Sequence, residues 1–108
     1  MLRCTVRWHQ AAQDELANLW LSGLDREALS RSANEIDVLL RISPATKGRP
    51  FGLAALDEVA IQLVQSRVDP LPEDLRFVVM GPLEFYYLAR ELDSLVLIVM
   101  ARRRRPSQ

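Results

Sequence analysis

Between residues 83 and 90, a carboxylate, a phenol and a guanidinium stand at even-numbered positions, in Glu84, Tyr86 and Arg90. If this segment is a strand, its period of two separates them from the apolar side chains. One face, which we expect to be open to solvent, carries Glu84, Tyr86, Leu88 and Arg90. The other face, suited to a core covered by helices, carries Leu83, Phe85, Tyr87 and Ala89. Arg76, on the preceding apolar run, could join the open surface. These groups could contact a ligand, or they could form ordinary cross-strand pairs on a solvated sheet.

Arginines gather at the end of the chain, where Arg102, Arg103, Arg104 and Arg105 are consecutive. The sequence has fourteen Lys and Arg and fourteen Asp and Glu, so residues 1–101 carry ten basic and fourteen acidic side chains. This balance excludes a uniformly basic nucleic-acid binder. The terminal guanidiniums could contact phosphate or an acidic partner, or they could be a solvated end without chemistry.

Several familiar catalytic devices are missing from the sequence. It has no glycine-rich phosphate loop, no paired His or Cys ligands and no serine elbow. Its one histidine, His9, suits a surface or helix-capping position, and its one cysteine, Cys4, cannot form an internal disulfide. We therefore expect neither a metal ion nor an organic cofactor.

The first half of the sequence predicts a strand followed by two helices. Residues 5–9 alternate as a short strand does. Apolar residues then recur at helical spacing from Ala12 to Trp20, and Gly23 is a C-cap signal. Asp25 is a suitable N-cap for a second helix, whose apolar spacing continues to Leu40. The short link between them predicts an antiparallel helical hairpin.

The middle of the sequence is harder to interpret. Residues 44–52 contain Pro and Gly together with Lys47 and Arg49, which predicts a loop with positive charges. Residues 53–68 fit a helical period at some positions and a strand period at others. We interpret them as a short helical turn followed by a strand.

The second half predicts a meander of antiparallel strands at residues 75–80, 83–89 and 95–101. The fold class is therefore α+β, with an N-terminal strand and a two-helix hairpin packed on one face of a twisted antiparallel sheet. A length of 108 residues indicates one domain. The start lacks the features of a signal peptide, and no apolar run reaches the roughly 18 residues that span a bilayer, so we expect a cytoplasmic protein without a membrane partner.

The order of these elements resembles the RelE/ParE superfamily of toxins from type II toxin–antitoxin systems. The matching segments are Val6-Arg7-Trp8, Asp14-Glu15-Leu16, Leu19-Trp20, Ala33-Asn34-Glu35-Ile36-Asp37, Gly81-Pro82-Leu83 and the arginines after the last strand. The similarity covers nearly the whole chain except residues 53–72, which look inserted relative to a compact member, and residues 102–108 form a basic tail.

Members that resemble RelE cut ribosome-bound mRNA without a metal, through attack of a ribose 2′-OH on the adjacent phosphate. Carried over to this sequence, the resemblance implies catalytic phosphate contacts by Arg76 and Arg103, with Arg102 alongside. Tyr86 is our candidate for the catalytic group that handles protons. We also expect nucleic-acid contacts by Lys47, Arg49, Arg102, Arg104 and Arg105. Two features depart from the RelE-type pattern: Glu84 stands where an arginine is expected, and the C-terminal tyrosine of several members has no counterpart.

From the resemblance we expect a toxin that inhibits translation by cutting ribosome-bound mRNA, and inhibition of DNA gyrase is the alternative. Members that resemble ParE inhibit DNA gyrase and cut nothing, and the two departures favour that alternative. A third possibility is a catalytically decayed member that only binds a partner. Every version implies a cognate antitoxin as a protein partner, because basic patches and sheet edges favour an acidic or strand-adding chain.

Overall fold

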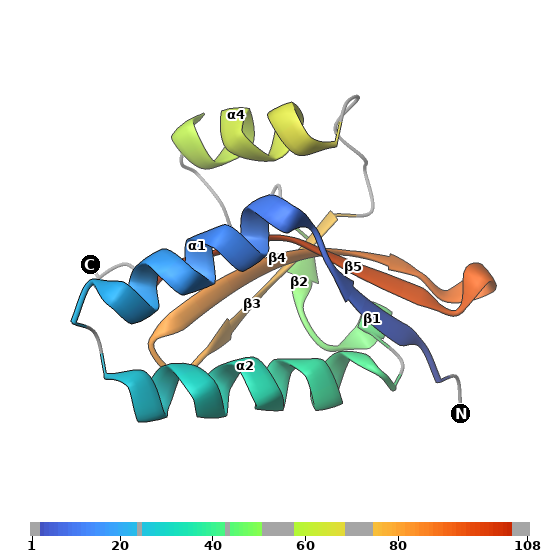
Figure 1. Cartoon of the computed structure of the whole chain (residues 1–108). Helices are drawn as coiled ribbons and strands as arrows, with labels where there is room; N and C mark the ends of the chain where they lie inside the picture. The colour runs from blue at the N-terminus through green and yellow to red at the C-terminus, as the bar shows by residue number, and fades with distance from the viewer. Residues whose placement is uncertain (1–2, 24, 43, 51–57, 69–74, 105–108) are drawn as a thin grey trace.

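A computed structural model of the chain describes residues 3–23, 25–42, 44–50, 58–68 and 75–104 (Figure 1). The helices are α1 (Gln10–Leu21), α2 (Arg26–Leu40) and α4 (Glu58–Arg67), and short 3₁₀ turns are η1 (Pro44–Thr46) and η2 (Glu91–Asp93). The strands are β1 (Thr5–Trp8), β2 (Arg49–Pro50), β3 (Leu75–Met80), β4 (Leu83–Arg90) and β5 (Leu95–Arg103). The predicted strand, helical hairpin and meander are confirmed.

The described strands form one sheet in the order β1-β5-β4-β3-β2. The pairs β2–β3, β3–β4 and β4–β5 are antiparallel, and Leu75 on β3 lies opposite Leu88 on β4. Strand β1 instead runs parallel to β5, with Thr5 opposite Leu95. The sheet is therefore mixed, whereas the sequence predicted an antiparallel one. A parallel pair needs a long crossover, which the helices and the meander provide here.

Each helix of the hairpin begins at a side chain that accepts hydrogen bonds from the first turn. His9 Nδ1 accepts from the Ala11 amide at 3.0 Å, which confirms the capping role expected for this histidine. The Asp25 carboxylate accepts from the amides of Glu27 and Ala28. Between the helices, Gly23 has a φ of +89°, a conformation that favours glycine. These caps satisfy amides that a helix start leaves unpaired.

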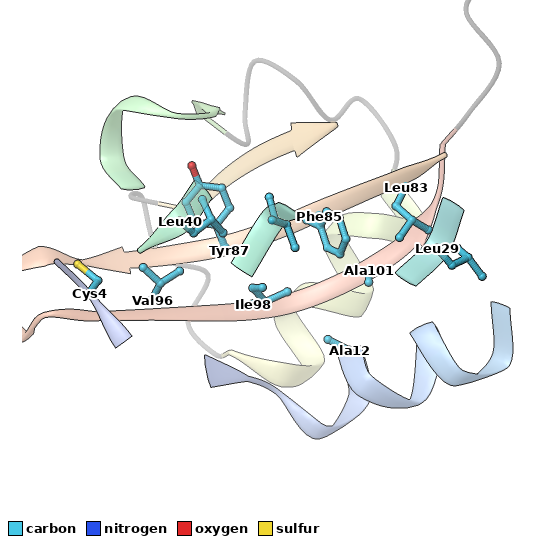
Figure 2. Close-up of a cluster of buried hydrophobic side chains, with 11 residues drawn as sticks. Cys4, Ala12, Leu29, Leu40, Leu83, Phe85, Tyr87, Val96, Ile98 and Ala101 are labelled. Atoms are coloured by element: carbon cyan, nitrogen blue, oxygen red, sulfur yellow. The ribbon is translucent and has the colours of Figure 1, made fainter. Parts of the chain in front are cut away.

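Helices α1 and α2 cover one face of the sheet, where they bury the larger of two hydrophobic clusters (Figure 2). Its buried members are Cys4, Ala12, Leu29, Ile36, Leu40, Leu83, Phe85, Tyr87, Val96, Ile98 and Ala101. The rings of Trp8 and Phe85 pack nearly perpendicular to each other, with their centroids 5.7 Å apart. The residues of β4 that the alternating pattern assigned to the covered face are therefore the ones that α1 and α2 cover.

Helix α4 lies on the opposite side of the sheet from α2 (Figure 1). Its Val64 is fully buried and its Ile61 is partly buried, three residues apart on one helical face. They pack on a second cluster whose other buried members are Leu75, Phe77, Tyr86, Leu88, Val99 and Met100. Two predictions are therefore wrong: residues 58–67 form a helix and not a strand, and the second sheet face is covered and not open. Residues 53–57 lie outside the described part.

Strand β5 is longer than β1, which pairs with it only from Leu95 to Ile98. Beyond Ile98, backbone groups on this edge of β5 form hydrogen bonds with the two side chains of an ion pair. Glu15 of α1 accepts from the Ala101 amide at 3.1 Å, and Arg67 of α4 donates to the Val99 carbonyl at 2.9 Å. Arg67 also binds Glu15 through both nitrogens, at 2.7 and 2.9 Å. One ion pair thus joins α1, α4 and the strand edge.

Candidate functional site

Arg76, the first predicted catalytic residue, lies on the face of the sheet that α1 and α2 cover. It stands opposite Tyr87 in the register of β3 and β4. One of its terminal nitrogens donates to the Gly48 carbonyl, and its buried Nε has no hydrogen-bond partner among the described residues. The guanidinium therefore holds the loop from Pro44 to Pro50 against the sheet.

Tyr87 completes this attachment from the neighbouring strand. Its side chain is fully buried, and its hydroxyl donates to the Pro44 carbonyl at 2.8 Å. Burial raises the pKa of the Tyr87 hydroxyl above its ordinary value, and the neighbouring Arg76 guanidinium opposes part of that rise. A phenol held in this way keeps its proton at physiological pH and serves as a structural donor.

Tyr86 belongs to a different group of side chains, on the face that α4 covers. Its hydroxyl accepts from Arg102 at 2.9 Å, and the same guanidinium donates to Glu84 at 2.9 Å. Phe77 packs on the Tyr86 ring with the centroids 5.0 Å apart. Tyr86 has no exposed surface, and Glu84 is only 4% exposed. Arg102 is therefore neutralised by a buried carboxylate, which limits its capacity to bind phosphate.

The structure does not bring Arg76 and Tyr86 together. Directly paired residues of a sheet point to the same side, so Arg76 shares a face with Tyr87, while Tyr86 shares the opposite face with Phe77. The prediction that Arg76 and Tyr86 occupy one open surface is wrong. The sequence pattern assigned the residues of β4 to the correct faces. The face on which Arg76 lies depends instead on how β3 pairs with β4, which the pattern does not show.

The remaining predicted cations are exposed, and they occupy separate places. Arg103 lies opposite Leu83, near the turn between β3 and β4, and the Arg104 amide donates to the Pro82 carbonyl at that turn. Lys47 and Arg49 project from the loop at the β2 edge of the sheet.

Strands β4 and β3 lie between β5 and β2, so three inter-strand spacings of about 4.8 Å separate the exposed pair on β5 from the pair near β2. The Arg49 guanidinium stands 6.0 Å from the centre of the Phe77 ring. The predicted contact residue Arg105 lies outside the described residues.

The sequence did not predict the structural roles of Gly48 or of the Glu15–Arg67 pair. A Cβ atom added to Gly48 would stand 2.5 Å from the Phe77 carbonyl oxygen and 2.8 Å from the Tyr87 hydroxyl, so only glycine lets the loop lie this close. Glu15 and Arg67 are 52 residues apart, and no local spacing indicates their pairing. The signal for Gly48 in the sequence is weak, because a single glycine between two cations is common in loops.

No three His, Cys, Asp or Glu side chains of the described segments come together as a possible metal site. Within the same segments, no helix has the length and apolarity needed to span a membrane.

No protein-family model matches the sequence, and no curated protein matches it either. Among solved structures, a chain of the toxin–antitoxin complex RelBE2 from Mycobacterium tuberculosis is similar, with a TM-score of 0.65 and 17% sequence identity. The similarity covers 96% of this chain and 94% of that chain. This chain has the fold of that RelBE2 chain. One fold can carry different activities, so the chemistry must be argued from the side chains described above.

Proposed function

We propose that the protein is the toxin component of a type II toxin–antitoxin module and that it acts by binding its target, without cutting RNA. The RelE-like fold, and the assembly of a similar chain in a toxin–antitoxin complex, support the first part. The observation that carries the second part is the placement of Arg76 and Tyr86 on opposite faces of the sheet, with Tyr86 fully buried and the half-buried Arg76 bonded to the loop at Gly48.

RNA cleavage by the 2′-OH requires several groups around one phosphate. A base must reach the hydroxyl within about 3 Å, and cations must meet the charge that develops on the phosphoryl oxygens. Here the candidate phenol, Tyr86, is buried under α4, and Arg102 beside it is paired with Glu84. Arg76 is used to hold the loop at Gly48. The described residues therefore offer exposed cations for adhesion but no assembled centre for proton transfer.

The resemblance to ParE-type toxins makes DNA gyrase the first target to test. A gyrase inhibitor needs a complementary surface and no catalytic group, which agrees with the buried position of Tyr86 and the structural contact of Arg76. A cognate antitoxin would then neutralise the protein by covering the surface that binds gyrase.

Ribosome-dependent mRNA cleavage is the second candidate, and one observation favours it. Four cations predicted to contact nucleic acid or phosphate are exposed: Lys47, Arg49, Arg103 and Arg104. Such residues could anchor the protein to ribosomal RNA through phosphate contacts that carry no sequence preference.

Controlled expression tests the proposal in two steps. We expect growth arrest that is relieved by co-expression of the protein encoded in the adjacent reading frame. The purified protein should then inhibit supercoiling of relaxed plasmid by gyrase and leave mRNA intact in a translating extract.

The double variant Arg76→Ala, Arg103→Ala and the variant Tyr86→Phe separate the candidates. Truncated mRNA that disappears in these variants, while they remain folded, would establish the nuclease instead. An absence of growth arrest would reject both toxin mechanisms and favour a member that only binds its partner.

A further inference from the structure

A hollow of about 450 Å³ opens between α2 and the end of β3. Val38, Leu39 and Met80 supply its apolar lining, and Asn34 and Glu35 complete it. Val38 is 62% exposed, because the buried stripe of α2 consists of other positions, among them Ile36 and Leu40. A single exposed valine is ordinary on a protein surface, but here it continues into a concave apolar lining.

A second hollow, of about 300 Å³, lies between α1 and α2. Trp8 and Leu16 supply apolar surface there, and Gln13 and Asp37 supply polar groups. Asn34 lines both hollows, so the two are neighbours on either side of the outer ridge of α2. A chain segment that crosses α2 at Asn34 could place one apolar side chain in each.

The charges around the two hollows are mostly acidic. No ion pair joins Glu35 to any residue in the described part of the chain, and Asp14 of α1 is bound there only by the amide of Gln10. Asp37 is paired with Arg41 in the next turn of α2. Helix α1 contains no Lys or Arg. An unpaired carboxylate beside apolar surface attracts a partner that carries both apolar and basic side chains.

We propose that the paired hollows on α2 bind a segment of the antitoxin that carries two apolar anchors and one Lys or Arg directed at Glu35. This inference rests on the proposed function, since it assigns a docking surface and a chemistry to the partner of that function. The apolar anchors supply most of the affinity, because buried apolar side chains dominate interfaces. The ion pair with Glu35 determines register and specificity.

The chain offers matched control residues for a test. Val38 on α2 and Val59 on α4 are both 62% exposed, and the two helices lie on opposite sides of the sheet (Figure 1). Glu35 and Asp93 are both exposed carboxylates, and Asp93 lies at the turn between β4 and β5. Substitutions at Val59 and Asp93 therefore introduce the same chemical change outside the hollows.

The probe is the purified protein encoded in the adjacent reading frame, titrated against the full-length chain by calorimetry. Val38→Glu should raise the dissociation constant by about tenfold or more. Glu35→Gln should raise it roughly threefold at low salt and less at high salt. Val59→Glu and Asp93→Asn should leave it unchanged. Circular dichroism spectra and thermal midpoints identify any variant that has lost its fold.

Exchanging the charges of Glu35 and of its proposed basic partner supplies a second measurement, which detects a gain of affinity rather than a loss. If each Lys and Arg of the probe is changed to Glu in turn, one of those variants should bind Glu35→Lys more tightly than it binds the wild-type chain. Wild-type affinity in Val38→Glu and Glu35→Gln would overturn the docking site and leave the proposed toxin intact. Failure of the probe to bind the wild-type chain would reject the toxin–antitoxin assignment itself, and the docking site with it.

Discussion

The hydroxyl of Tyr87 on β4 donates a hydrogen bond of 2.8 Å to the carbonyl oxygen of Pro44, 43 residues earlier in the chain. This bond joins the centre of the sheet to the 3₁₀ turn η1, which begins at Pro44 after α2. Arg76 adds a contact from β3 to Gly48 in the loop from Pro44 to Pro50. The two strands thus hold a segment that has little apolar surface of its own, and the local stability of this segment depends on polar contacts.

The buried Tyr87 hydroxyl makes stability depend on pH in the alkaline range. Its pKa is 10.0 in the unfolded chain and higher in the folded protein, because burial disfavours the phenolate. Between these two values the unfolded chain has released a proton that the folded protein still holds. The free energy of unfolding should therefore fall as the pH rises above 10, and it should fall less in Tyr87→Phe. Urea unfolding at a series of pH values measures this decrease in the wild-type protein and in Tyr87→Phe.

A direct titration checks the same prediction. The sequence contains two tyrosines, so Tyr86→Phe leaves Tyr87 as the single source of phenolate absorbance. That absorbance should appear only above pH 10 while the protein remains folded. A midpoint at or below 10 in the folded variant would contradict the burial argument.

Gly48→Ala should destabilise the protein by about 1–3 kcal/mol, since the added methyl group would overlap the Phe77 carbonyl and the Tyr87 hydroxyl. Gly23→Ala is the control, because no atom lies within 4 Å of the added carbon there. Its φ of +89° alone should cost about 1 kcal/mol. Chemical denaturation compares the two. If Gly48→Ala lowers the free energy of unfolding no more than Gly23→Ala does, the loop does not lie against β3 in solution.

Glu15→Ala should lower the free energy of unfolding by about 2 kcal/mol, because it removes the carboxylate that accepts from Arg67 and from the Ala101 amide. Glu15→Gln keeps an oxygen that can accept from the Ala101 amide, so it should lower the free energy of unfolding by less. Asp14→Ala, at the adjacent exposed position, should change stability by at most about 0.5 kcal/mol. Hydrogen exchange at Ala101 should accelerate in Glu15→Ala. Unchanged exchange there would show that the strand edge does not need this ion pair.

His9→Ala should cost about 1 kcal/mol, because the amide of Ala11 loses the acceptor that caps α1. His9→Asn should retain most of the stability, since asparagine is among the best N-cap residues. Thermal unfolding followed by circular dichroism distinguishes the two variants. If they are equally destabilised, the imidazole contributes by packing rather than by capping.

Elements with a consistent local period were predictable from the sequence. The apolar spacing of α2 and the N-cap at Asp25 act within one or two turns, so the residues that determine the helix are close neighbours in the chain. The alternation on β4 likewise assigns Tyr86 and Tyr87 to opposite faces from the local pattern alone. Residues 58–67 lacked such a signal, because Val59, Ile61 and Leu63 also alternate as a strand would.

Tertiary structure alone decided what covers each face and which side chains meet. Helix α4 covers Tyr86 because Val64 and Ile61 find apolar partners on β3, β4 and β5, which no local window contains. The register of β3 against β4 places Arg76 beside Tyr87 rather than Tyr86. Local periodicity encodes the direction in which a side chain points along its own element. Burial and pairing depend on contacts between residues distant in sequence, and those contacts form only when the elements pack.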